Sequence, residues 1–129
     1  MTIYDCTMFF NENDLLEVRL NQHWDSVDKF IIVEAGETHT GLKKPFNFDH
    51  ERFKPYMDKI VYRTFDSFDQ AIKDHPELVD SNTFSNRGGN KNAMDWGRDG
   101  FQANYTHKVL EELGAQDDDI IMHSCCDEI

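Results

Sequence analysis

Residues 3–34 read IYDCTMFFNENDLLEVRLNQHWDSVDKFIIVE, and this stretch predicts the fold of the chain. Residues 3–10 are aromatic and apolar, which is typical of a buried strand. Asn13 can then cap a helix. One face of that helix carries apolar residues at helical spacing, namely Leu16, Leu20, Trp24 and Val27. The run FIIV at residues 30–33 is unbroken and rich in β-branched residues, as expected for a strand covered on both sides.

The same alternation continues along the rest of the chain. The runs IVYRTF at residues 60–65 and IIMH at residues 120–123 predict a third and a fourth strand. A second helix is expected from about Asp99 to a C-capping glycine at Gly114. Its apolar stripe consists of Phe101, Tyr105, Val109 and Leu113. Strands that alternate with helices predict an α/β fold with a mostly parallel sheet flanked by helices.

Two segments are too polar and too irregularly patterned for regular elements. Residues 34–55 predict a long loop with a short helical piece, and residues 80–100 are rich in Asn and Gly. In parallel sheets ligands bind beyond the carboxyl ends of the strands. We therefore expect Asn11 and Glu12, Glu34, and residues 124–128 to lie on one rim.

The charge of the chain restricts its partners. With 13 Lys and Arg against 25 Asp and Glu, the 129 residues carry a formal net charge of −12. Such a surface repels nucleic acid, because phosphate binding needs clustered cations. No apolar run approaches the roughly 18 residues of a membrane span, and the N-terminus lacks the basic region of a signal peptide. We therefore expect a cytoplasmic protein.

Asp127 and Glu128 follow the last predicted strand. Acids in that position suit a hard divalent cation, which prefers oxygen ligands, although two solvated acids are the simpler interpretation of the dipeptide alone. Cys125 and Cys126 with His123 raise the alternative of a zinc site. No second Cys or His pair stands at zinc-finger spacing, so buried or reduced thiols are the preferred interpretation.

Taken together, these stretches resemble a known family. The segment IYDCTMFFNENDLLEVRLNQHWDSVDKFIIVEAGETHTG at residues 3–41 is close to the pattern IYDCFxFFNELDLLEIRLxELxxxVDxFVIVExxxTFTG of glycosyltransferase family 17. Residues 101–129 resemble its blocks FQRN and DDDIIIxSDxDEI. These proteins are related to the β-1,4-mannosyl-glycoprotein N-acetylglucosaminyltransferase. The match covers nearly the whole chain in the correct order, which is more specific than any single motif.

The resemblance implies a GT-A-type, Rossmann-like domain that binds a UDP-sugar. It also implies Mn²⁺ or Mg²⁺ at the DxD-like acids Asp127 and Glu128, and transfer of a sugar, GlcNAc or a related hexose, to a glycan or cell-surface acceptor. The nucleotide-sugar would contact residues at the matching positions, which are Asn11, Glu12, Glu34, Thr40, Gly41, Gln102 and Asn104. No catalytic base is assigned.

The sequence departs from the family pattern at two positions near these residues, Cys125 and Ala103. Cys125 replaces the first acid of SDxDEI, which predicts a weakened metal site because a thiol is a poor ligand for Mg²⁺. Ala103 replaces the arginine of FQRN. The family pattern also continues past the position of Ile129, so residues 1–129 would be an N-terminal, incomplete GT-A-like domain. Two alternatives therefore stand beside the transferase: a truncated, non-catalytic remnant that at most binds nucleotide, and a self-associating binding module.

Overall fold

The computed structural model describes residues 1–79 and 93–128. In chain order the regular elements are β1 (Ile3–Phe9), α1 (Asn13–His23), β2 (Lys29–Ala35), a 3₁₀ helix (Lys54–Tyr56), β3 (Ile60–Phe65), α2 (Phe68–Asp74), a second 3₁₀ helix (Pro76–Leu78), α3 (Ala93–Glu112) and β4 (Ile120–His123).

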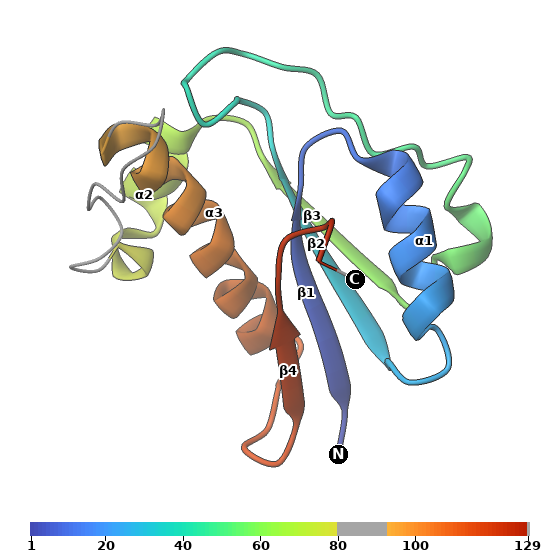
Figure 1. Cartoon of the computed structure of the whole chain (residues 1–129). Coiled ribbons are helices and arrows are strands. Elements are labelled where there is room, and N and C mark those ends of the chain that lie inside the picture. The colour runs from blue at the N-terminus through green and yellow to red at the C-terminus, as the bar shows by residue number, and fades with distance from the viewer. Residues whose placement is uncertain (80–92, 129) are drawn as a thin grey trace.

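The described strands form one sheet in which every neighbouring pair is parallel. The four strands stand in the order β3-β2-β1-β4 (Figure 1). Phe9 pairs with Glu34, and Cys6 pairs with His123, so the carboxyl ends of β1, β2 and β4 lie at the same edge. The predicted α/β class and parallel sheet are confirmed, and the architecture is that of a GT-A-like, Rossmann-type domain.

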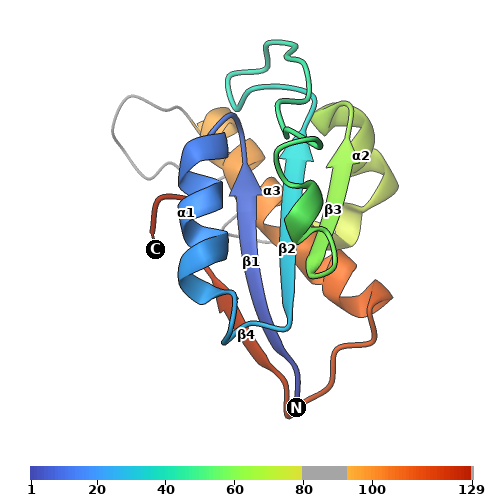
Figure 2. The same ribbon diagram turned by 90° about the vertical axis from the view of Figure 1, so that its right-hand side faces the viewer.

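Helices cover both faces of the central strands, as Figure 2 shows with α1 in front of the sheet and α3 behind it. Alternate residues of β2 supply the two cores because successive side chains of a strand point to opposite faces. Ile31 and Val33 pack in the cluster that includes Phe101 and Val109 of α3. On the opposite face, the core combines strand residues with α1 and the loop after β2, through Phe9, Leu16, Leu20, Phe30, Ile32, Phe48 and Phe53.

Helix α3 begins earlier than the sequence predicts. It starts at Ala93 rather than near Asp99, so the irregular segment expected over residues 80–100 is wrong for residues 93–100, and residues 80–92 lie outside the described part. The expected end is confirmed, since the helix stops at Glu112 and Gly114 adopts a φ of 73°. That left-handed conformation suits glycine because it has no Cβ.

Two further details differ from the sequence-based expectations. The N-cap of α1 is Glu12, and Asn13 is the first helical residue. Helix α2 was not expected, although Ser67 accepts a hydrogen bond from the Gln70 amide and both belong to a capping-box pattern. The helix has seven residues and buries only Phe68 and Ala71, so its apolar periodicity is too short to detect.

Strand β4 is the least covered of the four. Ile120, Ile121 and Met122 are 43%, 48% and 39% exposed. Whether the chain self-associates stays a prediction. None of the described helices combines the length and the apolar character that crossing a membrane requires.

Candidate functional site

The order of the strands places a ligand-binding crevice at one position. From β1 the chain moves through β2 to β3 and then returns across the sheet to β4, on the other side of β1. The connections on the two sides of β1 therefore use opposite faces, which makes a topological switch point between β1 and β4. A cavity of about 520 Å³ lies at the carboxyl ends of these strands. This volume falls within the range of roughly 300–1,000 Å³ that is typical of ligand sites.

Residues that follow β1 form the first wall of the cavity, and Asn11 and Glu12 belong to it. Oε1 of Glu12 accepts hydrogen bonds from the amides of Phe10, at 2.9 Å, and Asn11, at 2.8 Å. Glu12 thus holds the turn from β1 into α1 while it lines the cavity. Phe10 is 45% exposed and adds an apolar surface to this wall.

The loop after β2 forms the second wall, together with α3. Thr40 and His39 line the cavity, and so does Gln102 of α3. Gln102 is only 4% exposed, and its Nε2 donates to the carbonyl groups of Phe9 and Val33, at 3.4 and 2.9 Å. Its Oε1 lies 2.8 Å from Nε2 of His39. The Gln102 amide therefore ties the ends of β1 and β2 to the loop that carries Thr40.

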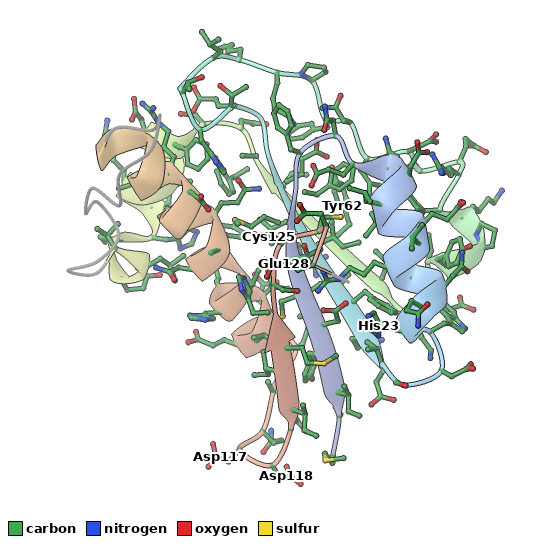
Figure 3. The ribbon with its side chains drawn as sticks, in the orientation of Figure 1. His23, Tyr62, Asp117, Asp118, Cys125 and Glu128 are labelled. Atoms are coloured by element: carbon green, nitrogen blue, oxygen red, sulfur yellow. The ribbon has the colours of Figure 1, made fainter. Side chains whose placement is uncertain are left out.

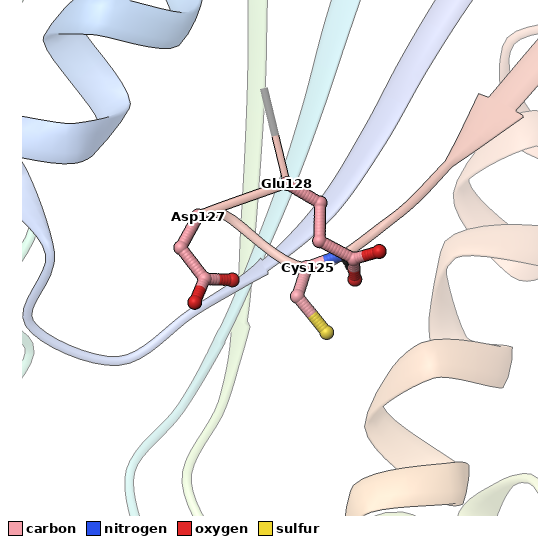
Figure 4. A group of neighbouring side chains, drawn as sticks. All are labelled: Cys125, Asp127 and Glu128. Atoms are coloured by element: carbon pink, nitrogen blue, oxygen red, sulfur yellow. Dashed lines mark hydrogen bonds between the residues drawn. The ribbon is translucent and has the colours of Figure 1, made fainter.

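The turn after β4 forms the third wall, through Cys125, Cys126 and Asp127. Cys125, Asp127 and Glu128 can each bring one ligand atom within 4.8 Å of the others (Figure 4). The turn is closed by two hydrogen bonds, from the Glu128 amide to the Cys125 carbonyl at 3.0 Å and from the Cys125 amide to Oε1 of Glu128 at 2.9 Å. The pKa of Glu128 is lowered, mainly because the Cys125 amide donates to its carboxylate.

The thiols next to this cavity hold their protons firmly. Partial burial of the thiol, then its hydrogen bond to Glu128, raises the pKa of Cys125 to about 11, although the residue as a whole is exposed. Burial raises the pKa of Cys126 to about 12. A protonated thiol is a poor metal ligand, because the thiolate is the coordinating form. The candidate ion-binding group is thus two carboxylates and one neutral, soft side chain.

The structure separates some expected site residues from the cavity. Glu34 is fully buried and does not line it. The carboxylate accepts hydrogen bonds from Lys44 Nζ at 2.7 Å, the Asn47 amide at 2.6 Å and the Tyr62 hydroxyl at 2.6 Å. Glu34 therefore anchors the long loop after β2. The register alone could not reveal this, because the partners of Glu34 come from that loop and from β3.

Gly41 and Asn104 also lie outside the residues that line the cavity. Gly41 has a φ of 92°, and a Cβ at this position would lie 3.2 Å from the guanidinium of Arg98. Its role is thus to let the loop turn tightly over α3. Asn104 donates from Nδ2 to the Leu78 carbonyl at 2.8 Å, which joins α3 to the 3₁₀ helix that follows α2.

The zinc alternative does not gain support from the described residues. The group that could hold a metal contains Cys125 but neither His123 nor Cys126. Cys126 is 1% exposed and packs in the core beneath α1.

Sequence reasoning did not identify Arg19, a buried residue of α1 that donates hydrogen bonds to the turn after β4. Arg19 and Asp5 are 3% and 2% exposed and form a bidentate ion pair, with Nε–Oδ2 at 2.8 Å and Nη2–Oδ1 at 2.5 Å. Burial alone would lower the pKa of Arg19, but the hydrogen bond and charge of Asp5 raise it. An acid inside an apolar strand and an arginine beside Leu16 and Leu20 on the apolar helix face were the available signals.

The charge around the cavity is negative. Four of its lining residues are acidic, namely Glu12, Glu37, Asp99 and Asp127, and none of the described lining residues is Lys or Arg. An anionic ligand would therefore need a cation beside it, whereas a neutral polar ligand would not.

One comparison with known proteins identifies the family. The sequence model of the glycosyltransferase family 17 proteins matches residues 1–129, which is the whole chain. No curated protein and no solved structure matches significantly. The family match agrees with the parallel α/β sheet. The chain therefore belongs to glycosyltransferase family 17.

Proposed function

We propose that this chain binds a UDP-sugar in the cavity between β1 and β4 and takes part in transfer of the sugar, GlcNAc, to a glycan acceptor. The observation that carries the proposal is that Asn11 and Asp127, from opposite ends of the chain, line the same cavity at the switch point of a parallel sheet. Nucleotides bind at such points in open α/β sheets.

The negative cavity favours a metal-assisted mode of binding. A diphosphate would meet the carboxylates of Glu12, Asp99 and Asp127, and the described lining residues offer no Lys or Arg. A bound Mn²⁺ or Mg²⁺ would neutralise the diphosphate and stabilise it as the leaving group. The carboxylates of Asp127 and Glu128 fit such an ion, because hard cations select oxygen ligands.

The fit is partial, because two features weaken the group. Cys125 stands where the family pattern has an acid, and its thiol, with a pKa of about 11, is neutral near pH 7. One carboxylate oxygen of Glu128 already accepts the Cys125 amide. We therefore expect low metal affinity, with most of the coordination shell left to water and phosphate oxygens.

The remaining lining residues would orient the donor. The side chains of Asn11 and Thr40 offer hydrogen bonds to sugar hydroxyl groups, and Phe10 and Leu15 give an apolar wall that excludes water. Gln102 acts indirectly, because its amide is occupied by contacts with both strand ends and the loop.

A second candidate is a domain that binds the nucleotide but does not transfer the sugar. The observation that favours it is Cys125, since a neutral thiol supplies no charge against the diphosphate. The two candidates differ in transfer and share the binding step. A transfer assay with UDP-GlcNAc and Mn²⁺, run on this chain alone and on a chain extended to the length of the family pattern, separates them.

The binding step is tested first by calorimetric titration of UDP with and without Mn²⁺. We expect binding that strengthens when Mn²⁺ is present, and loss of that increment in Asp127→Asn. Asp118→Asn is the matched control, because it makes the same change of charge at the other end of β4 (Figure 3). If UDP does not bind with or without Mn²⁺, or if both variants lose the increment equally, the proposed site is wrong.

A further inference from the structure

The turn at residues 125–128 packs against the core through Cys126, but few hydrogen bonds join its main chain to the rest of the domain. The last main-chain hydrogen bond that joins the end of β4 to β1 runs from the Ser124 amide to the Cys6 carbonyl at 3.2 Å. Beyond it, the turn closes on itself through Cys125 and Glu128. Among the described residues, the one hydrogen-bond donor from outside residues 124–128 that reaches this turn is Arg19.

Every nitrogen of the Arg19 guanidinium donates a hydrogen bond. Nη1 donates to the Cys125 carbonyl at 2.7 Å and to the Glu128 carbonyl at 3.3 Å. Nη2 donates to Ser124 Oγ at 2.7 Å and to Asp5, and Nε donates to the second oxygen of Asp5. The five donors of a guanidinium are thus all matched, with Asp5 fixing one edge of the fork and the turn occupying the other.

These contacts act on the main chain on both sides of Asp127. The carbonyl groups of Cys125 and Glu128 belong to residues that precede and follow Asp127 in the turn. Because one guanidinium nitrogen binds both carbonyl groups, it restricts the path of the backbone between them. The position of the Asp127 Cα is therefore restricted as well.

The position of Arg19 is fixed by β1, because its ion pair with Asp5 joins α1 to that strand. The turn is therefore located relative to β1. The segment that follows β1 supplies Asn11 and Glu12 to the cavity, so Arg19 sets the third wall of the cavity relative to the first.

We propose that Arg19 is the positioning residue of this site, which holds the turn at residues 125–128 so that the Asp127 carboxylate faces the cavity. The proposal rests on the proposed function for the role of Asp127, but the positioning itself is a property of the fold. Arg19 does not line the cavity, so it acts only through the turn.

Lysine cannot replace this arrangement. Its ammonium group is a point charge with three donors on a flexible stem, whereas the contacts of Arg19 need a planar fork with five. A Lys at position 19 that pairs with Asp5 would leave carbonyl groups of the turn without a donor. Substitution by Lys therefore keeps the charge and removes the positioning.

The alternative is that the Asp5–Arg19 pair only stabilises the domain. A buried ion pair can often be replaced by apolar residues of similar volume with little loss of stability. The double variant D5L/R19M thus keeps the α1–β1 packing and removes every hydrogen bond from Arg19 to the turn. Arg52→Met is the matched control, because Arg52 pairs with Asp14 and Glu17 of α1 and not with the turn.

Two buried thiols report the position of the turn without any ligand. Cys126 belongs to the turn and is 1% exposed, and Cys6 lies in β1 and is fully buried. Alkylation of the native protein, resolved by peptide mass spectrometry, gives the ratio of the Cys126 rate to the Cys6 rate. Global unfolding exposes both thiols and leaves the ratio nearly unchanged, whereas release of the turn raises it.

We expect the Cys126 to Cys6 ratio to rise roughly ten- to a hundredfold in R19K and in D5L/R19M, because hydrogen bonds to a charged group are lost from the turn. R52M should leave the ratio at the wild-type value. An unchanged ratio in R19K overturns the proposal even if the double variant fails to fold.

UDP titration with Mn²⁺ on the same variants then tests the consequence for binding. We expect R19K to lose the Mn²⁺ increment and R52M to keep it. If the wild-type chain does not bind UDP, the proposed function is wrong. The ratio of the Cys126 and Cys6 alkylation rates still tests the positioning role of Arg19 in that case.

Discussion

Nζ of Lys44 lies 2.7 Å from Oε2 of Glu34, and both side chains are almost completely buried, at 6% and 0% exposure. The pair connects the carboxyl end of β2 to the long loop that follows it. The Lys44 ammonium also donates to the Ala35 carbonyl at 2.9 Å and lies over the ring of Phe10. The cation is thus placed to hold the loop and the adjacent wall of the cavity together.

Lys44→Met should destabilise the domain by about 3–5 kcal/mol, because it leaves the Glu34 carboxylate buried without its counter-charge. The free energy of unfolding is measured by urea denaturation at pH 7. Lys43→Met is the control, since Lys43 is exposed, and it should change the stability by no more than about 0.5 kcal/mol. Equal effects of the two substitutions would show that the buried pair contributes nothing particular.

Asp119 makes the stability depend on pH at the start of β4. Its carboxylate accepts the Gln116 amide at 2.7 Å and the Thr2 amide at 2.8 Å, and these bonds lower its pKa from the ordinary value of 3.8. A depressed folded-state pKa stabilises the protein above about pH 4, and the contribution is lost as the pH falls through the folded value.

Asp119→Asn should therefore lower the melting temperature at pH 7 and make its decline below about pH 4 shallower. Thermal melts between pH 7 and pH 2 measure both effects. Asp118→Asn, in the same turn, is the control, because the Asp118 carboxylate accepts no hydrogen bond from the described residues. A wild-type acid slope in Asp119→Asn would contradict the assignment.

The regular elements with long apolar patterns were predictable from the sequence. The run at residues 30–33 and the stripe of Phe101, Tyr105 and Val109 belong to the observed cores, to which the run at residues 60–65 contributes its apolar residues. Helix α2 and the first turns of α3 were missed, because they are short or polar and are formed with tertiary contacts.

The site was less predictable than the fold. The rule that ligands bind at the carboxyl ends of parallel strands brought Asn11, Glu12 and Asp127 to one cavity. The rule does not give the direction of a side chain, and so it placed Glu34 at the site, where the structure turns its carboxylate toward the loop after β2. Contacts between distant segments, such as those of Arg19 with the turn after β4, follow only from the folded chain.

The alkylation rate of Cys125 should depend on the hydrogen bond and the charge of the Glu128 carboxylate. Partial burial and then the hydrogen bond to Glu128 raise the pKa of Cys125 to about 11, with smaller effects from the charges of Glu128, Asp99 and Asp127. Because the thiolate is the nucleophile, the alkylation rate should rise about tenfold per pH unit from pH 7 to pH 10. Glu128→Gln should increase the rate at pH 8, and Glu111→Gln, on the exposed surface of α3, should not. Equal alkylation rates in the wild type, Glu128→Gln and Glu111→Gln would show that Glu128 does not affect the pKa of Cys125.

Cys125→Asp should increase the effect of Mn²⁺ on UDP binding. The new carboxylate would stand with Asp127 and Glu128 in a group whose ligand atoms already reach within 4.8 Å of one another. Without metal, the third acid adds repulsion, so the melting temperature of the variant should be lower than that of the wild type.

With Mn²⁺ the same charge becomes favourable. A further unit charge about 4 Å from a divalent ion in water contributes on the order of 2 kcal/mol, so we expect UDP affinity in the presence of Mn²⁺ to rise at least about tenfold. Cys125→Ser is the matched control, because it removes the thiol and adds no charge, and it should bind UDP as the wild type does. If Cys125→Asp and Cys125→Ser bind UDP equally, with Mn²⁺ present, then the residue at position 125 does not face the ion and the metal group lies elsewhere in the cavity.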